Sequence, residues 1–183
     1  MKESADRRSA RTKKALKSAM LELLDKKEIS KITVSELAQM ADIGRGTFYL
    51  HYADPYDLRD KLDDELLAQT MGRHEPLLAH WSADNLLAHL ENVWQYIYEN
   101  KEAFKILMHR RNGTRFIEKF RQNCEAAAFS RGNPRHSAEY YGVVYVTSGT
   151  LGIFQSWLDD GATMPPAQLA QIVRNLIMGM SGE

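Results

Sequence analysis

Side chains that can donate hydrogen bonds crowd one short stretch, residues 45–52, which reads RGTFYLHY. The polar ones are Arg45, Thr47, Tyr49 and His51. Phe48 and Tyr52 stand four residues apart, so on a helix both can face a core while the polar side chains point elsewhere. A short helix with small residues and donors on its free face suits entry into the major groove of DNA. These residue types therefore favour hydrogen bonding to phosphates and base edges.

The element that must position this helix begins at Thr33. Residues 34–41 carry apolar side chains at i, i+3, i+4 and i+7, which is one stripe of a helix. Thr33 precedes that stripe and Glu36 follows three residues later, which predicts a capping box. Residues 42–44, DIG, then break the helix. Two short helices joined by a tight turn predict a helix-turn-helix over residues 33–52.

The charge of the chain is zero overall but unevenly distributed. Residues 1–52 hold 11 Lys/Arg and 7 Asp/Glu, a net +4, and residues 53–183 hold 13 and 17, a net −4. A basic end beside a helix-turn-helix predicts a phosphate-contacting surface, although the tail alone would pass for a solvated one. The basic side chains among the first 17 residues are Lys2, Arg7, Arg8, Arg11, Lys13, Lys14 and Lys17.

Other chemistries find little support in the sequence. The single cysteine, Cys124, excludes an intramolecular disulfide and a cysteine-based zinc site. The six histidines show no pair or carboxylate cluster at metal-ligand spacing, and no nucleophile–base arrangement appears. We therefore expect no metal, no cofactor and no enzymatic activity. The charged N-terminus has no apolar signal segment, so a cytoplasmic location is expected.

Helical periodicity recurs along the whole chain, and no stretch alternates with the period of a strand. We expect an all-α protein of about nine helices. Asp54 and Pro55 predict the start of a helix whose acids face away from the basic end. The expected helices cover residues 9–25, 34–41, 45–52, 55–71, 82–99, 103–108, 116–129, 140–158 and 166 onward. The sequence predicts two domains. Residues 9–69 form a helix-turn-helix domain, and residues 76–180 form a C-terminal dimerisation and candidate effector-binding domain.

Residues 140–158 carry no formal charge. A membrane span is one interpretation, but the hydroxyl and amide side chains, the three glycines and the acids that follow favour a helix buried between subunits. Small residues would let a second helix approach, and a last apolar helix would complete a four-helix bundle across a two-fold axis. The predicted dimer interface comprises Gly149, Gly152, Ser156, Ile172 and Leu176.

Aromatic residues of the C-terminal half have two interpretations. They line an effector pocket between helices, or they simply pack the core, which accounts for most of them. The candidate pocket residues are Trp94, Tyr98, Phe104, Phe116, Phe120, Tyr141 and Tyr145.

The segment ITVSELAQMADIGRGTFYLHYADPYDL resembles the pattern T-x-x-x-I-A-x-x-A-G-V-S-x-G-T-x-Y-x-H-F-x-x-K-x-x-L of the TetR (tetracycline-repressor) family of bacterial transcription regulators. The match covers residues 9–67 and is strongest over 45–52. The segment YYGVVYVTSGTLGIFQSWLDDGATMPPAQLAQIV is similar to a subgroup common in low-GC Gram-positive bacteria. Asp42, Gly44 and Pro55 depart from the pattern, at positions where Gly, Ser and a phosphate-binding Lys are usual.

The resemblance implies an all-helical homodimer that binds double-stranded DNA and often a small effector. By the family motif, Thr33 contacts phosphate, Arg45, Gly46 and Thr47 meet base edges or phosphates, and Tyr49 and His51 reach the backbone. The expected function is repression through a palindromic operator, relieved by a small-molecule effector, with Lys13 and Lys14 among the phosphate contacts. The alternative is a helical co-regulator whose helix-turn-helix contacts another protein.

Overall fold

The computed structural model describes residues 2–71, 83–108, 113–129 and 136–180. These residues form nine α-helices, one short 3-10 helix and no strand, so the predicted all-α class is confirmed. The helices are α1 (Lys2–Lys26), η1 (Ile29–Lys31), α2 (Val34–Met40), α3 (Arg45–Tyr49), α4 (Pro55–Met71), α5 (Ala83–Glu99), α6 (Lys101–Met108), α7 (Gly113–Phe129), α8 (Ala138–Asp159) and α9 (Pro166–Met180).

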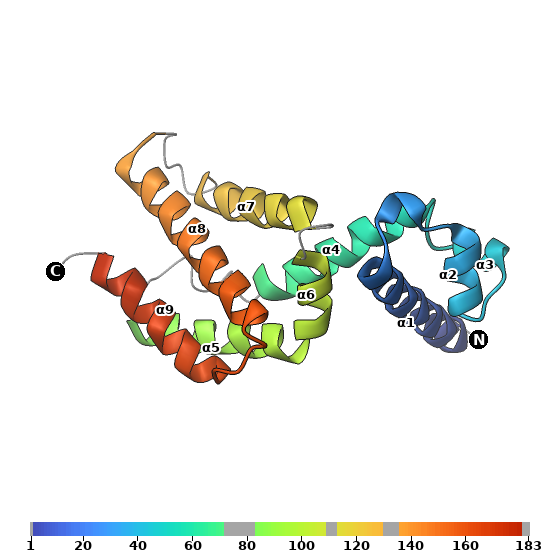
Figure 1. Ribbon diagram of the computed structural model, residues 1–183, viewed down its shortest axis with the longest axis horizontal. Helices are drawn as coiled ribbons and strands as arrows, with labels where there is room; N and C mark the ends of the chain where they lie inside the picture. Colours follow the sequence, from blue (N-terminus) through green and yellow to red (C-terminus); the bar gives the residue numbers. More distant parts are fainter. Residues whose placement is uncertain (1, 72–82, 109–112, 130–135, 181–183) are drawn as a thin grey trace.

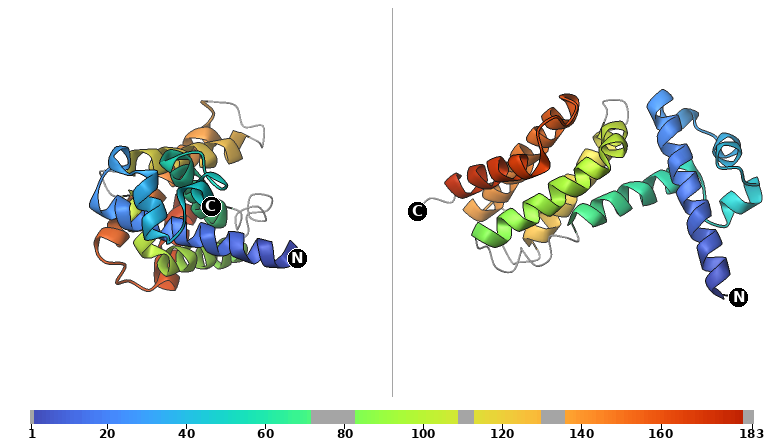
Figure 2. Two further views of the ribbon diagram at one scale, coloured as in Figure 1. Left: turned by 90° about the vertical axis from the view of Figure 1, so that its right-hand side faces the viewer. Right: turned by 90° about the horizontal axis from the view of Figure 1, so that it is seen from below.

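The molecule is elongated, with α1, α2 and α3 grouped at one end (Figure 1). We call residues 2–52 the head. Helix α4 runs from the head into the C-terminal half, as the view from below in Figure 2 shows. In the C-terminal half α5 packs along α9, and α8 packs against α6 and α7. Helix α6 also contacts α1, so the head touches the C-terminal half at two elements.

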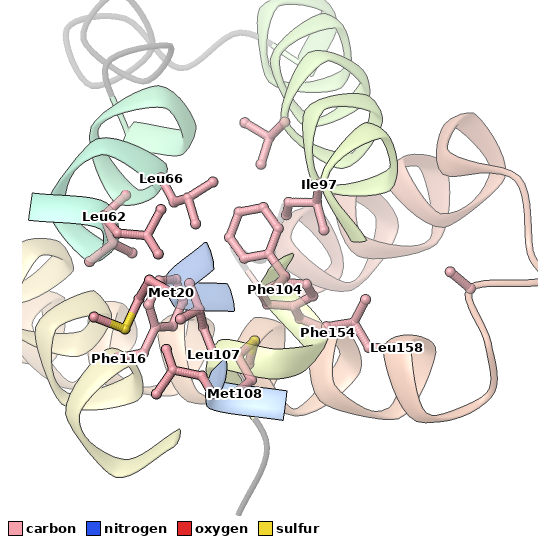
Figure 3. Close-up of a cluster of buried hydrophobic side chains, with 14 of the residues drawn as sticks. Met20, Leu62, Leu66, Ile97, Phe104, Leu107, Met108, Phe116, Phe154 and Leu158 are labelled. Atoms are coloured by element: carbon pink, nitrogen blue, oxygen red, sulfur yellow. The ribbon is translucent and has the colours of Figure 1, made fainter. Parts of the chain in front are cut away.

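One hydrophobic core continues from the head into the C-terminal half, and Figure 3 shows part of it. It begins in the head with Met20 of α1, passes Leu62 of α4, and reaches Phe104 of α6 and Phe154 of α8. All four side chains are at least 95% buried. Helix α4 therefore belongs to both halves as far as packing is concerned.

Helix α4 also carries a buried ion pair. Arg59 Nε donates to Asp63 Oδ1 at 2.7 Å, one helical turn away, and both side chains are at most 3% exposed. The guanidinium group of Arg59 also reaches the Leu107 carbonyl of α6 at 3.5 Å. Burial raises the pKa of Asp63, against the opposing effect of Arg59.

The acids of α4 do not all face away from the basic end, so that expectation is wrong. Glu65 forms an ion pair with Lys17 of α1. Asp60 and Asp64 meet α7, where Lys119 Nζ lies 2.7 Å from Asp64 Oδ1. The physical reason is that α4 lies between α1 and α7, so acids on its exposed positions still reach basic side chains of both helices.

Several helix boundaries differ from the predicted ones by one to seven residues, most of all the start of α1. Helix α1 begins at Lys2 and not at Ser9, because residues 2–8 contain neither glycine nor proline and nothing in them ends a helix. Helix α3 ends at Tyr49 and not at Tyr52. Beyond it the chain must turn toward α4, although the Tyr52 amide still donates to the Phe48 carbonyl at 3.0 Å.

None of the helices in the described ranges has the length and apolar character needed to cross a lipid bilayer. The uncharged segment in α8 has one buried face, which includes Phe154 and Trp157, and packs on neighbouring helices.

Candidate nucleic-acid interface

The start of α2 is fixed by the predicted capping box. The Thr33 hydroxyl accepts from the Glu36 amide at 3.2 Å, and Glu36 Oε2 accepts from the Thr33 amide at 3.0 Å. The hydroxyl of Thr33 also donates to the same carboxylate at 2.9 Å, and Lys27 Nζ lies 2.5 Å from Glu36 Oε1. The hydrogen bonds from Lys27 and Thr33 lower the pKa of Glu36 to about 2. The Thr33 hydroxyl thus already donates its proton to a carboxylate within the head.

The turn between α2 and α3 depends on a left-handed residue. Asp42 has φ 54°, and its short polar side chain makes it one of the residues that tolerate this conformation best. The amide of Ile43 then donates to the Ala38 carbonyl at 2.9 Å and closes the turn. Gly44 is the N-cap of α3 with extended backbone and has no side chain with which to cap it. Asp42 and Gly44 therefore hold the positions that the sequence predicted for them.

Helix α3 has one face in the core and the other in solvent. Phe48 and Tyr52 are at most 3% exposed, as predicted. Arg45, Gly46 and Tyr49 are exposed, whereas Thr47 and His51 are half-buried. A side chain at Gly44 or Gly46 would meet no heavy atom of the described residues within 4 Å, so the backbone of α3 is open to a bulky ligand. The structure thus gathers five of the predicted contact residues on one short, accessible helix and the turn that follows it.

The cationic side chains predicted to contact phosphate lie on α1. Lys13 and Lys14 are exposed, and neither makes an ion pair or hydrogen bond with the described residues. Lys17, one turn later, is engaged by Glu65. The charge available for an anionic ligand is therefore concentrated in the first half of α1.

The start of α4 follows the predicted cap. The amide of Asp57 donates to Asp54 Oδ1 at 2.8 Å, and Asp57 Oδ2 accepts from the Ala53 amide at 2.9 Å. Lys61 pairs with Asp57 at 2.9 Å and lies 5.2 Å from the centre of the Tyr52 ring. Hydrogen bonds from Lys61 and from the Ala53 amide lower the pKa of Asp57. These contacts anchor the end of the head to α4.

A small apolar cavity lies between α4, α5, α6, α7 and α8. Its volume is about 60 Å³, and four predicted pocket residues, Trp94, Phe104, Phe116 and Phe120, line it. The structure places the other three elsewhere: Tyr98, Tyr141 and Tyr145 lie outside this cavity and are 37%, 55% and 64% exposed. Leu67 and Thr70 of α4 also form part of the wall, and sequence periodicity alone did not single them out.

The outer face of α8 and α9 carries the residues predicted for a dimer interface. Gly149, Gly152 and Ser156 are exposed, and side chains at the two glycines would find open space. Ile172 and Leu176 of α9 are 39% and 52% exposed. This face is apolar and small-residue-rich, and a single copy of the chain leaves it uncovered. Elsewhere in the described residues, no group of three or more His, Cys, Asp or Glu is placed to hold a metal ion.

Comparison with known proteins adds the family. The family model described as "Transcriptional regulator C-terminal region", of TetR type, matches residues 84–179, more than half of the chain. The chain belongs to the TetR family of transcriptional regulators. The pattern in residues 32–58 and this match in the other half agree on that family.

Individual relatives and solved structures resemble the chain over most of its length. An uncharacterized HTH-type transcriptional regulator of Bacillus subtilis, YxbF, is 27% identical over 170 residues, which are 88% of this chain and 43% of that protein. The chain thus spans less than half the length of this curated relative. A TetR transcriptional regulator from Streptococcus agalactiae is 21% identical with a TM-score of 0.67, over 97% of this chain and 99% of that one.

NalD from Pseudomonas aeruginosa, described as the secondary repressor of a multidrug efflux pump, is 20% identical. Its TM-score is 0.65, over 93% of this chain and 95% of that one. At these identities the solved structures support the fold of this TetR-family chain, and its ligands and operator are a separate matter.

Proposed function

We propose that this TetR-family regulator is a cytoplasmic homodimer that represses transcription by binding a palindromic DNA operator, and that a small effector relieves the repression. The observation that carries the proposal is α3, a short helix held at its start by Asp42 and Gly44 with its outer face exposed. A helix of this kind, presented next to basic side chains, fits the major groove of DNA.

The contacts in this proposal divide into two kinds. Arg45, Gly46 and Thr47 meet base edges or adjacent phosphates, and Tyr49 and His51 reach the sugar–phosphate backbone. Lys13 and Lys14 add phosphate neutralisation, which makes binding strongly salt-dependent. Thr33 contributes to phosphate binding only by sharing a hydroxyl already engaged with Glu36, so its contribution is expected to be the weakest.

Two-fold pairing of the α8–α9 face would set the spacing of the heads. Recognition helices of a dimer enter successive major grooves about 34–36 Å apart. The support is the exposed stripe of α8 that contains Gly149, Gly152 and Ser156, together with the exposed Ile172 and Leu176 of α9. An apolar surface of this kind marks an interaction site more often than a solvated one.

The cavity supports the effector part of the proposal. Its wall is made of apolar and aromatic side chains with two threonines, which is typical of a small-molecule site. Its volume of about 60 Å³ is well below that of a site for a drug-sized ligand, which is about 300 Å³ or more. An effector would therefore have to widen the cavity, and widening it on the side of Leu67 and Thr70 would move α4.

The test is a mobility-shift assay with DNA selected by the wild-type chain from a random-sequence pool, at low and high salt. Specific binding that weakens steeply with salt is expected. Arg45→Ala should cost about 1–3 kcal/mol of discrimination and relax specificity at one position, if the side chain reads a base. The control is Lys105→Ala, which removes an exposed cation from α6 and should leave binding unchanged. A folded dimer without any specific shift would instead favour the protein-contact role.

The dimer is tested separately by sedimentation. Gly149→Leu should shift the chain toward monomer, because the new side chain projects from the exposed stripe where open space within the monomer accepts it. Thr163→Leu, an equally exposed change in the α8–α9 connection, is the control. A Gly149→Leu variant that still sediments as a dimer would refute this interface.

A further inference from the structure

Leu50 is the most exposed large apolar side chain among the described residues, at 81%. It follows α3 directly, as its C-cap, and its backbone is still in the right-handed helical region. Exposed leucines that occur singly need no explanation. This one stands at the end of the helix proposed to enter DNA, next to Tyr49, which is itself 53% exposed.

The direction of the Leu50 side chain follows from the helix geometry. Its amide donates to the carbonyl of Gly46 at 3.3 Å, so the two residues lie one turn apart on the same face. Helical side chains lean toward the N-terminal end of the helix, so Leu50 lies on the same face as Gly46 and leaves more than 4 Å of open space above it. Gly46 has no side chain, and a Cβ there would meet no heavy atom of the described residues within 4 Å. Leu50 and the bare backbone of Gly46 thus form an open apolar notch, which we call the Leu50 notch.

The neighbours of the notch identify what it fits. Arg45 adjoins Gly46 on the same exposed helix, and Phe48 and Tyr52 face the core on the opposite side. A leucine offers no hydrogen bond, so a polar base edge pressed against it would lose water without compensation. In the major groove only thymine presents an apolar group, its 5-methyl.

We propose that Leu50 is a specificity-determining residue that packs against the 5-methyl group of one thymine in each operator half-site. The absent side chain of Gly46 lets that base edge approach the helix closely. This inference rests on the proposed DNA binding and adds to it an apolar contact that reads sequence. The family motif has an unspecified residue at this position, so the motif alone does not give the contact.

The experiment uses deoxyuridine, which differs from thymidine only by lacking the methyl group. The duplex selected by the full-length wild-type chain is resynthesised with each thymine replaced in turn. One thymine per half-site should be sensitive, with a loss of affinity of about fourfold for one half-site and about fifteenfold for both. For Leu50→Ala the same replacement should change affinity less than about 1.5-fold, while its effects at all other thymines stay as in the wild type.

Two further variants keep the test independent of folding. Leu50→Gln retains the size of the side chain and should also lose the thymine preference, because its amide is hydrated. Gly46→Ala fills the notch with a methyl group that the head can accommodate, and should lower affinity most for duplexes that carry the thymine. Unchanged circular dichroism and melting temperature establish that each variant is folded, as the 81% exposure of Leu50 leads us to expect.

The outcomes separate the two proposals. Specific DNA binding with no methyl-sensitive thymine overturns the role of Leu50 and leaves the operator-binding function standing. A Leu50→Ala variant that weakens all duplexes equally shows a sugar–phosphate contact and also overturns it. Failure of the wild type to select any DNA overturns the proposed function itself, and the thymine contact with it.

Discussion

The head and the cavity wall are stabilised by opposite kinds of contact. Contacts that fix the helix starts in and next to the head are polar and join residues close in sequence: Thr33 with Glu36, Lys27 with Glu36, and Asp54 with Asp57. Contacts that shape the cavity wall are apolar and remote in sequence, as between Trp94 and Phe154, whose ring centroids lie 5.9 Å apart. The head is therefore specified by nearby residues, and the C-terminal half by the meeting of distant helices.

This difference sets how much stability a substitution costs in each region. A cap or a turn residue is replaceable at a cost of about 1 kcal/mol, since it satisfies only one or two backbone groups. A ring in a packed core cannot be removed without a cavity, and the cost is several times larger. The head can thus vary its surface chemistry while its backbone stays fixed. The packing of the cavity wall, by contrast, is disturbed by any substitution that changes side-chain volume.

The largest effect is expected from Phe104→Ala. Phe104 is 1% exposed and contacts the rings of Phe116 and Phe154 at centroid distances of 5.8 Å and 5.4 Å. Removing it should lower the free energy of unfolding by about 3–5 kcal/mol. Urea denaturation monitored by fluorescence measures the change. The matched control is Tyr56→Ala, which also deletes an aromatic ring but from a side chain 46% exposed, and should stay within about 0.5 kcal/mol.

A smaller but clear effect is expected from Arg59→Met, because the change leaves Asp63 buried without its cationic partner. The cost should be about 3 kcal/mol at neutral pH, measured by urea denaturation. Burial already raises the pKa of Asp63 and would raise it further in the variant. A raised pKa favours the folded state below the unfolded pKa, near 4, and this contribution is lost as pH rises through the folded pKa. The deficit should therefore shrink toward pH 4.

The double variant Arg59→Met/Asp63→Leu is the control for that measurement. It removes both charges and replaces them with apolar groups, so it should recover most of the stability lost in the single variant. A single variant as stable as the wild type at pH 7 would mean that Asp63 is not dependent on Arg59.

The smallest effect is expected at the capping box and is seen as a pH dependence. The pKa of Glu36 is lowered from 4.5 to about 2, so its contribution to stability is present above pH 4.5 and lost as pH falls through 2. The amide in Glu36→Gln does not titrate, so this variant has no such contribution to lose as the pH falls. Its melting temperature should therefore fall less between pH 5 and pH 3 than that of the wild type. Parallel melting curves for the two proteins over this range would contradict the assignment.

The same difference explains what sequence reasoning could reach. The capping box, the left-handed Asp42 and the Asp54 cap are encoded within a few residues. The two caps were predicted from residue types and spacing, and Asp42 was marked by the family resemblance, which has Gly at that position. The cavity wall was predicted only in part, because which face of α8 meets α7 depends on packing that no local pattern records. Tyr141 and Tyr145 share their helix with Phe154, yet only Phe154 reaches the cavity.

The buried ion pair of α4 was the other feature that the sequence did not predict. Arg59 and Asp63 have the spacing of an ordinary surface pair, and only the packing of α4 against α1 and α5, with the Leu107 carbonyl of α6 within reach of Arg59, makes them interior. Leu50 is the reverse case, since a leucine is expected inside and stands 81% exposed. Both follow from how helices are arranged around α4 and α3, which composition and periodicity do not determine.

The continuous core that runs from Met20 through Leu62 to Phe154 has a consequence for how the molecule melts. A head joined to the rest only by a linker would come apart by itself and leave its own peak in a calorimetric scan. Here the interior of the head is continuous with that of the C-terminal half, because α4 and α6 both pack against α1 and add side chains to one connected core. One heat-absorption peak is therefore expected for the whole chain. A substitution that loosens any part of that core should lower the cooperativity of unfolding of the whole chain.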